Sequence, residues 1–273
     1  MTSEFEARRR IVEIGRRLWE RGFVASNDGN LSIRLADGRI VVTPTGVSKG
    51  FLDPRELVVV DARGTRLSGT LRPTSELRMH LFAYARRSDV GAVVHAHPPK
   101  ATGFSAAGVS LGQCVLPEVV LSLGDVPTAP YATPSTEEVA RSIERFIDGY
   151  SAMLLRRHGV LTLGADIDEA YFRMETVEHV AEISLVARSL GGALPLTDEE
   201  MRKLLRVREK LGVTTAARCA SCGGCVAGRR EQPAGAAAPP PGGRSPSAAD
   251  VREADAAVVE EVIRRVRNTL GSS

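Results

Sequence analysis

Apolar residues recur along the first two thirds of the chain with two different periods. The helical spacing of three and four residues occurs in four stretches, at 4–21, 75–87, 135–148 and 166–190. β-branched and alternating runs predict strands at 31–35, 39–43, 57–61, 65–68, 90–97, 152–156 and 160–163. Several of these strands follow each other through hairpin turns. The pattern therefore predicts an α/β fold with a mixed, largely antiparallel sheet covered by helices, and not a Rossmann fold.

The pattern changes near residue 216. Residues 226–248 are rich in Ala, Pro, Gly and Arg, a composition that cannot bury a core and that predicts a flexible linker. Beyond it, apolar residues at helical spacing predict an amphipathic tail helix, with one stripe formed by Val258, Val259, Val262, Ile263, Val266 and Leu270. We therefore divide the chain into a domain at 1–216, a cysteine cluster with linker at 217–248 and a tail helix at 249–273.

Composition narrows the class of protein. The 273 residues are 43% hydrophobic and 25% charged, as in ordinary globular proteins. The 36 Lys and Arg nearly balance the 33 Asp and Glu, so nothing favours nucleic acid as a partner. The sequence shows no apolar run of the roughly 18–20 residues that span a bilayer and no secretory signal. Because three of the four cysteines cluster locally, we expect a reducing, cytoplasmic compartment.

Three of the five histidines lie in two short motifs, Val94-His95-Ala96-His97-Pro98 and Arg157-His158-Gly159. His95 and His97 are two apart in a predicted strand, which places both on one face. They either bind one divalent ion or are two satisfied core histidines. His158 precedes a glycine at a turn that can aim its side chain. Three imidazoles leave one position open on a tetrahedral zinc, as in catalytic sites, although imidazole also suits other transition metals.

Glu76 is expected in the first turn of the helix at 75–87, with Thr74 as its N-cap. A carboxylate there could complete a coordination shell, act as a general base beside a metal, or only interact with the helix dipole. His80 lies one helical turn further on. The spacing permits a direct Glu76–His80 pair, and we favour a structural or supporting role for that histidine.

Two loops have the composition of anion-binding sites. They read Asn-Asp-Gly-Asn-Leu-Ser at 27–32 and Thr-Pro-Thr-Gly-Val-Ser-Lys at 43–49. Thr74 and Ser75 add a helix N-terminus, where backbone N–H groups favour phosphate. Each loop, taken alone, could equally be a turn without a ligand. Lys49 brings a positive charge that faces either a phosphate or water.

Taken together, these motifs resemble the class II aldolase/adducin family. The matching elements, in this order along the chain, are Gly29-Asn30-Leu31-Ser32, Thr43-Pro44-Thr45-Gly46, Ser75-Glu76, His95-Ala96-His97, Ala129-Pro130-Tyr131-Ala132-Thr133 and His158-Gly159. The resemblance implies a three-layer α/β/α fold and a homotetramer with active sites at subunit interfaces. It also implies one zinc per subunit, held by His95, His97 and His158, and an acid/base role for Glu76. The implied phosphate-binding residues are Asn30, Thr45, Gly46, Thr74 and Ser75.

Within the family, the chain is most similar to the enzymes that cleave L-fuculose 1-phosphate. That activity yields dihydroxyacetone phosphate and a small aldehyde such as lactaldehyde. Ribulose-phosphate 4-epimerases usually have Asp where Glu76 stands, which favours an aldolase. The family's aldolases carry a catalytic Tyr near 116–118, where this chain has Glu118. Alternatives are a 5-methylthioribulose or 5-deoxyribulose 1-phosphate aldolase or dehydratase, a ribulose-phosphate 4-epimerase, and an adducin-like binding module, which would lack the zinc histidines.

The C-terminal region departs from the family. Cys219, Cys222 and Cys225 have the spacing of metal ligands but no fourth local ligand, so an iron–sulfur cluster, a second zinc and reduced thiols all remain open. The tail helix at 249–273 resembles the peptides that dock enzymes into bacterial microcompartment shells. Its alternative role is to pack against its own tetramer.

Overall fold

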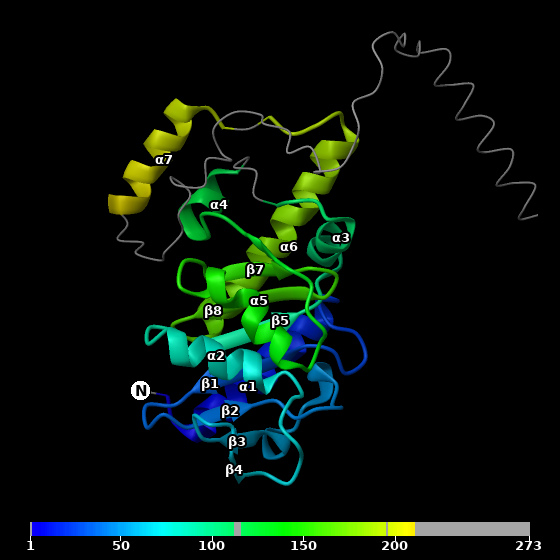
Figure 1. Cartoon of the computed structure of the whole chain (residues 1–273), viewed down its shortest axis with the longest axis vertical. Helices are drawn as coiled ribbons and strands as arrows, with labels where there is room; N and C mark the ends of the chain where they lie inside the picture. Colours follow the sequence, from blue (N-terminus) through cyan, green and yellow to red (C-terminus); the bar gives the residue numbers. More distant parts are fainter. Residues whose placement is uncertain (1, 112–115, 195, 211–273) are drawn as a thin grey trace, which may run out of the picture. The chain divides into compact units, whose positions relative to one another are not determined.

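The computed structural model describes residues 2–111, 116–194 and 196–210. Within these ranges the strands form one sheet in the order β4-β3-β2-β1-β5-β8-β7-β6 (Figure 1). The strands are β1 (Asn30–Arg34), β2 (Ile40–Val42), β3 (Val58–Val60), β4 (Arg66–Ser68), β5 (Ala92–Ala96), β6 (Thr128–Ala129), β7 (Ala152–Leu155) and β8 (Gly159–Gly164). The helices are α1 (Glu4–Glu20), α2 (Leu77–Arg86), α3 (Pro99–Ala107), α4 (Pro117–Ser122), α5 (Glu137–Ile147), α6 (Ile167–Ser189) and α7 (Asp198–Lys210), with short 3₁₀ turns at Lys49–Phe51 and Pro54–Glu56.

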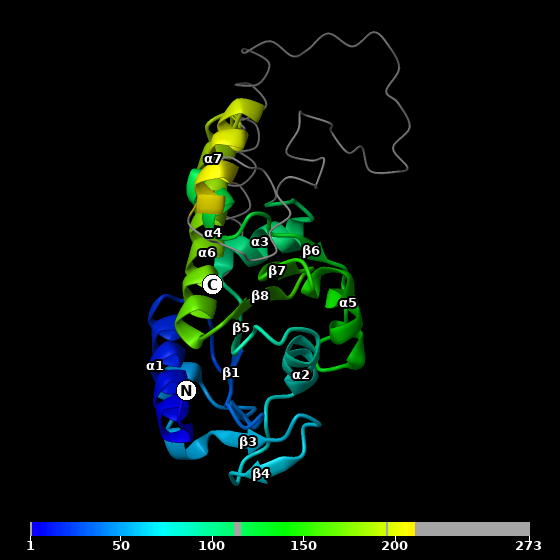
Figure 2. The same cartoon turned by 90° about the vertical axis from the view of Figure 1, so that its left-hand side faces the viewer.

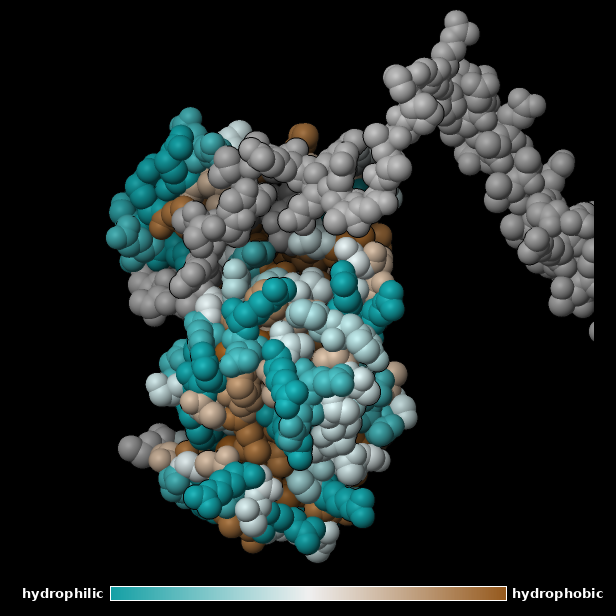
Figure 3. Space-filling view, in the orientation of Figure 1, coloured by the Kyte–Doolittle hydropathy of each residue, from teal (hydrophilic) through white to brown (hydrophobic). Residues whose placement is uncertain are grey.

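Helices cover both faces of the sheet. Figure 2 shows α1 and α6 on one side and α2 and α5 on the other. Because strand side chains alternate between faces, β5 sends Val94 into the apolar cluster beneath α1 and α6 and Val93 into the one beneath α2 and α5. Two cores on opposite faces of one sheet confirm the predicted three-layer α/β/α architecture. The α2 and α5 side presents a mainly hydrophilic surface outward (Figure 3).

The sheet is antiparallel except for the β6–β7 pair, which is parallel. In the β1–β5 pair, Asn30 lies directly opposite His95, and on the other side of β5 His95 lies opposite Leu161 of β8. The start of β1, the end of β5 and the turn between β7 and β8 therefore lie at the same end of these neighbouring strands. This end of the sheet carries the histidine motifs.

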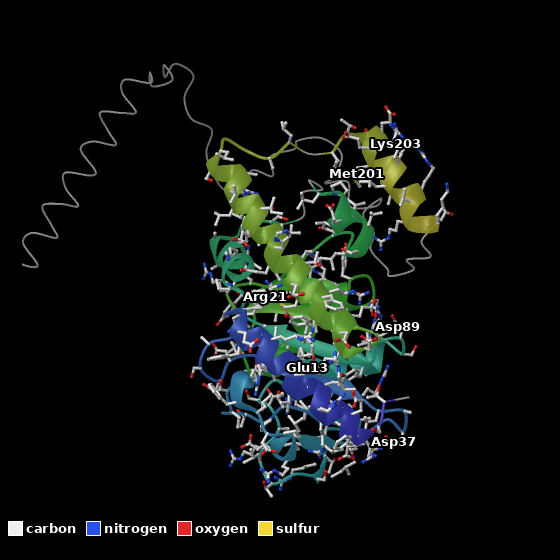
Figure 4. All side chains as sticks on the ribbon, turned by 180° about the vertical axis from the view of Figure 1, so that it is seen from behind. Glu13, Arg21, Asp37, Asp89, Met201 and Lys203 are labelled. Carbon is white, nitrogen blue, oxygen red and sulfur yellow. The ribbon has the colours of Figure 1, made fainter. Side chains whose placement is uncertain are left out.

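On one side of the sheet, α1 from the start of the chain packs beside α6, which comes much later in the sequence. In α1, Ile11, Ile14 and Leu18 are fully buried against the sheet. Figure 4 shows α1 and α6 from this side, with Glu13 and Arg21 labelled. Ion pairs from Arg10 to Asp168 and from Arg21 to Glu175 link the two helices. In the described ranges no helix is both long and apolar enough to cross a membrane.

Several boundaries differ from those expected. The helix predicted at 75–87 begins at Leu77, so Glu76 occupies the N-cap position and not the first turn. Thr74 instead accepts the backbone N–H of Glu76 at 3.3 Å. The strand predicted at 90–97 is shorter, and His97 follows its end. Helices α3, α4 and α7 and the two-residue strand β6 were not expected. The predicted cysteine cluster, linker and tail helix lie outside the described residues.

Candidate functional site

The three histidines singled out by their motifs converge. His95 lies in β5, His97 follows that strand, and His158 lies in the turn before β8. One ring nitrogen from each lies within 4.8 Å of the others, and the Nε2 atoms of His95 and His97 are 3.1 Å apart. In the described part of the chain, no other group of three or more His, Cys, Asp or Glu has this geometry. The ring nitrogens are therefore placed to hold a single metal ion.

Groups outside the triad orient its imidazoles. His95 donates from Nδ1 to the Val160 carbonyl at 2.9 Å, which leaves Nε2 facing the centre. The Nδ1 atom of His97 lies 3.4 Å from the Asp28 carboxylate. A carboxylate or carbonyl on the outer nitrogen is the usual way in which a protein fixes the tautomer of a metal-binding histidine. The sequence reasoning missed Asp28 because its loop was interpreted only as an anion site, for which a carboxylate has the wrong charge.

Gly159 leaves the space that the imidazoles fill. A Cβ atom at this position would lie 2.5 Å from the Ala96 carbonyl oxygen and 2.5 Å from Cδ2 of His97. Next to His158, Arg157 has a left-handed backbone with φ of 57°, which is rare for a residue with a side chain. The Arg157 N–H donates to the buried Ser105 hydroxyl at 2.8 Å, a contact that holds the turn. The His-Gly motif thus has a steric cause.

Glu76 faces the same centre. It is 9% exposed, with Oε2 3.2 Å from Nε2 of His95 and Oε1 3.3 Å from Nε2 of His158. Asn30 donates to Oε2 at 2.9 Å, while Oε1 is buried and has no hydrogen-bond partner. A buried carboxylate oxygen without a partner is costly unless a cation compensates it. The arrangement fits a divalent ion held by the three imidazoles, which would bring positive charge next to Oε1.

The ionisation of Glu76, His97 and His158 suits a metal site. Burial lowers the pKa of His158 to about 4, and the charge of His95 adds to this effect. Burial also lowers the pKa of His97, again with His95 contributing. His95 differs, because Glu76 outweighs the effect of burial and raises its pKa. Burial alone would raise the pKa of Glu76, but His95, His158 and Asn30 hold it well below its usual range. Glu76 is therefore a carboxylate at neutral pH, and His97 and His158 are neutral, as metal ligands must be.

A cavity of about 270 Å³ opens onto this cluster. All five residues implied as phosphate binders line it, together with every member of the cluster except the fully buried His95: Asn30, Thr45, Gly46, Thr74, Ser75, Glu76, His97 and His158. Ser135, which the sequence reasoning did not single out, also lines the cavity and donates to the Ser75 hydroxyl at 2.9 Å. A larger hollow of about 460 Å³ near Arg21 and Lys100 contains none of the cluster residues, so we assign the chemistry to the smaller one.

Lys49 belongs to the cavity wall and does not face water. It is only 1% exposed, and its Nζ donates to the carbonyls of Asn27, at 2.8 Å, and Val47. The ammonium thereby ties together the two loops that were interpreted as anion sites. Burial lowers the pKa of Lys49 to about 8, partly offset by the charge of Asp28. It still carries a positive charge at neutral pH.

Other candidates lie elsewhere. Glu118 is exposed on α4 and does not line the cavity, and His179 is exposed on α6. His80 makes no hydrogen bond with Glu76, because Asn30 lies between them. Cys219, Cys222 and Cys225 fall outside the described residues.

Comparison with known proteins agrees with this geometry. Residues 9–185 match the family model for the class II aldolase and adducin N-terminal domain. An L-fuculose phosphate aldolase of Methanococcus maripaludis is 36% identical over 181 residues, which are 66% of this chain and 97% of that protein. A 3-oxo-tetronate 4-phosphate decarboxylase of Escherichia coli K12 is 33% identical over 187 residues, 67% of this chain and 88% of that protein.

Solved structures give the same result. YgbL of Escherichia coli, described as a putative aldolase/epimerase/decarboxylase, matches with a TM-score of 0.69 and 32% identity over 74% of this chain and 98% of that one. An L-fuculose 1-phosphate aldolase matches with a TM-score of 0.70 and 30% identity over 76% of this chain and 96% of that one. The resemblance expected from the motifs is confirmed, and the chain belongs to the class II aldolase and adducin family.

Proposed function

We propose that this protein is a metal-dependent lyase that releases dihydroxyacetone phosphate from a ketose 1-phosphate of the L-fuculose 1-phosphate type. The observation that carries the proposal is the meeting of three imidazoles and the Glu76 carboxylate at the floor of a cavity with a phosphate-binding rim. Both groups of relatives, the L-fuculose phosphate aldolases and the 3-oxo-tetronate 4-phosphate decarboxylases, act on phosphorylated sugars or sugar acids. The histidines are all present, which argues against a non-catalytic binding module.

The residues divide the work between the two ends of the substrate. Thr45, Gly46 and Ser75 are exposed at the rim, where hydroxyl and backbone N–H groups would hold the phosphate. Lys49 adds a fixed positive charge beneath this rim. The three histidines would hold zinc, which as a Lewis acid stabilises negative charge developing on the hydroxy-ketone oxygens.

Glu76 is placed to move the proton. The Glu76 carboxylate accepts the proton of the C4 hydroxyl. As the C3–C4 bond breaks, C4 becomes an aldehyde and the bonding electrons stay on the three-carbon fragment as an enediolate. The protonated Glu76 then gives its proton to the enediolate carbon, and dihydroxyacetone phosphate forms. Oε1 of Glu76, which has no hydrogen-bond partner, is the oxygen free for this exchange.

The decarboxylase relatives support a second candidate. In a 3-oxo-tetronate 4-phosphate, loss of CO₂ from the carbon next to the ketone leaves the same enediolate, which takes one proton and gives dihydroxyacetone phosphate. CO₂ departs without giving up a proton, so this reaction needs no base at the leaving group. The exposed Glu118, at the position where the aldolases carry a catalytic Tyr, is compatible with that simpler requirement.

A substrate panel distinguishes the candidates. L-fuculose 1-phosphate, 5-deoxyribulose 1-phosphate, 5-methylthioribulose 1-phosphate and a 3-oxo-tetronate 4-phosphate are each incubated with the protein, and dihydroxyacetone phosphate, aldehyde and CO₂ are measured. We expect dihydroxyacetone phosphate with aldehyde, abolished by a chelator and restored by zinc. CO₂ without aldehyde would favour the decarboxylase. Dehydration or epimerisation without carbon–carbon cleavage, or no metal uptake at all, would contradict the proposal.

We also propose an oligomeric state, a cellular location and a partner for this protein. We infer a homotetramer in the cytoplasm, with residues 249–273 docking to a microcompartment shell protein. Deletion of 249–273 is expected to leave turnover unchanged and to abolish co-sedimentation with shell proteins. Dissociation of the tetramer on that deletion would instead show that the tail packs against its own assembly. Metal and sulfide analysis of a Cys219→Ser variant tests whether the cysteine cluster holds zinc or iron.

A further inference from the structure

A chain of buried polar side chains runs from the core to Glu76. The Tyr84 hydroxyl lies 2.7 Å from the Ser32 hydroxyl, which lies 2.6 Å from Nδ1 of His80. Nε2 of His80 lies 2.6 Å from Oδ1 of Asn30, whose Nδ2 donates to Glu76 at 2.9 Å. Ser32 and His80 are fully buried, and Asn30 and Tyr84 are 4% and 6% exposed. The chemistry proposed above does not use Tyr84, Ser32 or His80.

The direction of every hydrogen bond in this chain follows from its end at Glu76. A carboxylate only accepts, so Asn30 must present its NH₂ to Glu76 and its carbonyl oxygen to His80. Nε2 of His80 therefore carries the hydrogen. Burial lowers the pKa of His80 to about 3, which keeps the ring neutral and leaves Nδ1 as an acceptor. Ser32 then donates to Nδ1, and Tyr84 donates to Ser32.

We infer, on the basis of the proposed function, that His80 is a positioning residue that holds the Glu76 carboxylate, through Asn30, in the orientation required for proton transfer. The chain fixes Oε2 from one side and leaves Oε1 facing the imidazoles and the cavity. Asn30 itself lines the cavity. Because Tyr84 and His80 lie one helical turn apart in α2, packing of that helix against the sheet sets the position of the carboxylate.

A positioning role differs from a merely structural one in what it changes. A structural histidine contributes to stability, and its loss lowers the melting temperature without selectively slowing a proton transfer. A positioning histidine changes the rate of the step that Glu76 performs, while the phosphate rim and the three imidazoles keep their affinities. The donor on Nε2 is the essential group, so a side chain with an N–H at that place should restore the rate.

The first experiment follows deuterium exchange into the hydroxymethyl carbon of dihydroxyacetone phosphate in D₂O by proton NMR. This half-reaction needs only Glu76 and the metal. We expect His80→Leu to slow exchange at saturating substrate about 10- to 100-fold, the usual cost of losing such a supporting contact, with KM and metal content unchanged. His80→Gln, whose amide keeps a donor for Asn30, should recover most of the rate. The exposed His179→Leu variant is the control.

The outcomes separate the inference from the function on which it rests. No exchange by the wild type, or undiminished exchange by Glu76→Gln, overturns the proposed function and the inference with it. Exchange by the wild type together with an unchanged rate in His80→Leu overturns the inference alone. Loss of bound metal in His80→Leu also overturns it, because the defect would then lie in the imidazole set. Failure of His80→Gln to recover rate counts against the Nε2 donor.

A second pair of variants covers the case in which His80→Leu does not fold. Tyr84→Phe removes only the first hydroxyl of the chain, and Tyr171→Phe removes the hydroxyl of another buried tyrosine, which bonds Glu175 on the other side of the sheet. We expect slower exchange in Tyr84→Phe alone, and equal rates would overturn the inference. NMR of isotope-labelled histidine imidazoles should show His80 as the Nε2–H tautomer, and the Nδ1–H tautomer would equally overturn it.

Discussion

At the residue scale, the imidazoles depend on neighbours that carry no chemistry. The ring of His97 lies where a side chain on residue 159 would have to go, and the turn that carries His158 needs a left-handed Arg157. These requirements explain why a His-Gly dipeptide is informative in this sequence. They also make Gly159 the position where a small substitution should disturb the metal ligands.

Gly159→Ala should therefore weaken metal binding. The new Cβ would meet a backbone carbonyl and the His97 ring at distances that real Cβ atoms do not adopt, so that ring must shift. We expect the dissociation constant for zinc to rise about 10- to 100-fold, as for other disturbances next to metal ligands. A competition titration with a chromophoric chelator measures it. Gly103→Ala, where the Cβ meets nothing within 4 Å, is the control.

Lys49 should make phosphate binding pH-dependent. Its pKa of about 8 lies below the ordinary value for lysine, so its charge is lost as the pH rises through about 8. We expect KM for the phosphorylated substrate to rise above that pH. Lys49→Met should have a higher KM at neutral pH and no further rise from this group, with its metal content unchanged. An identical pH profile in both proteins would contradict the role of Lys49.

Much of the site could be predicted from single residues and their spacing. The triad was predicted because period two places His95 and His97 on one face and a His-Gly turn can aim His158. Glu76 was considered from its expected place in a first helical turn, and its acid/base role came from the family resemblance. The chain of Tyr84, Ser32 and His80 was not found, because it joins a helix to a strand whose facing the sequence does not specify. Only the i, i+4 spacing of His80 and Tyr84 signalled that they share a helix face.

At the element scale, α1 owes its stability to the face that it buries. Ile11, Ile14 and Leu18 are fully buried in one cluster. Ile14→Ala should lower the free energy of unfolding by about 2–5 kcal/mol through lost burial and a residual cavity. Urea denaturation followed by circular dichroism measures the change. Phe5→Ala, on the same helix but 78% exposed, should change stability little, and equal losses would contradict this assignment.

The elements that sequence reasoning missed had weak or overlooked signals. Helix α3 has little apolar periodicity, because small residues fill most of its positions. Its limits did have a signal in the sequence, with Pro99 at its start and Gly108 at its end. Helix α7 had a clearer signal. Thr197 and Glu200 exchange hydrogen bonds as a capping box, with Thr-x-x-Glu visible in the sequence. Seven of the eight strands in the described residues were predicted, and the local hairpins indicated an antiparallel sheet. The two-residue strand β6, which pairs in parallel with β7, was too short to be predicted.

At the scale of the whole molecule, the buried histidine of α2 couples folding to pH. The pKa of His80 is about 3 in the folded chain, against an ordinary value of 6.5. Below pH 6.5 the His80 ring is therefore protonated in the unfolded chain but stays neutral in the folded chain. The free energy of unfolding consequently decreases as the pH falls from 6.5 towards 3. His158 acts in the same direction, whereas the raised pKa of His95 acts in the opposite one.

Thermal melts of the metal-free protein between pH 7 and pH 4 test this coupling. The melting temperature should fall with pH, and the fall should be smaller in His80→Gln, which lacks the titrating ring. His179→Gln, altered at an exposed position, should follow the wild type. Parallel curves for the wild type and His80→Gln would show that the buried ring does not contribute.

The pairing of Asn30 opposite His95 links the histidine motif to the holder of Glu76 through backbone hydrogen bonds alone. A shift of β1 by one residue along β5 would turn Asn30 to the other face of the sheet. Insertions or deletions inside these two strands should therefore abolish activity even where the domain still folds. The Ala36–Gly38 turn lies at the far end of β1, so changes of length there leave the pairing intact. The alignment of two strands thus decides which parts of the gene can vary in length and which cannot.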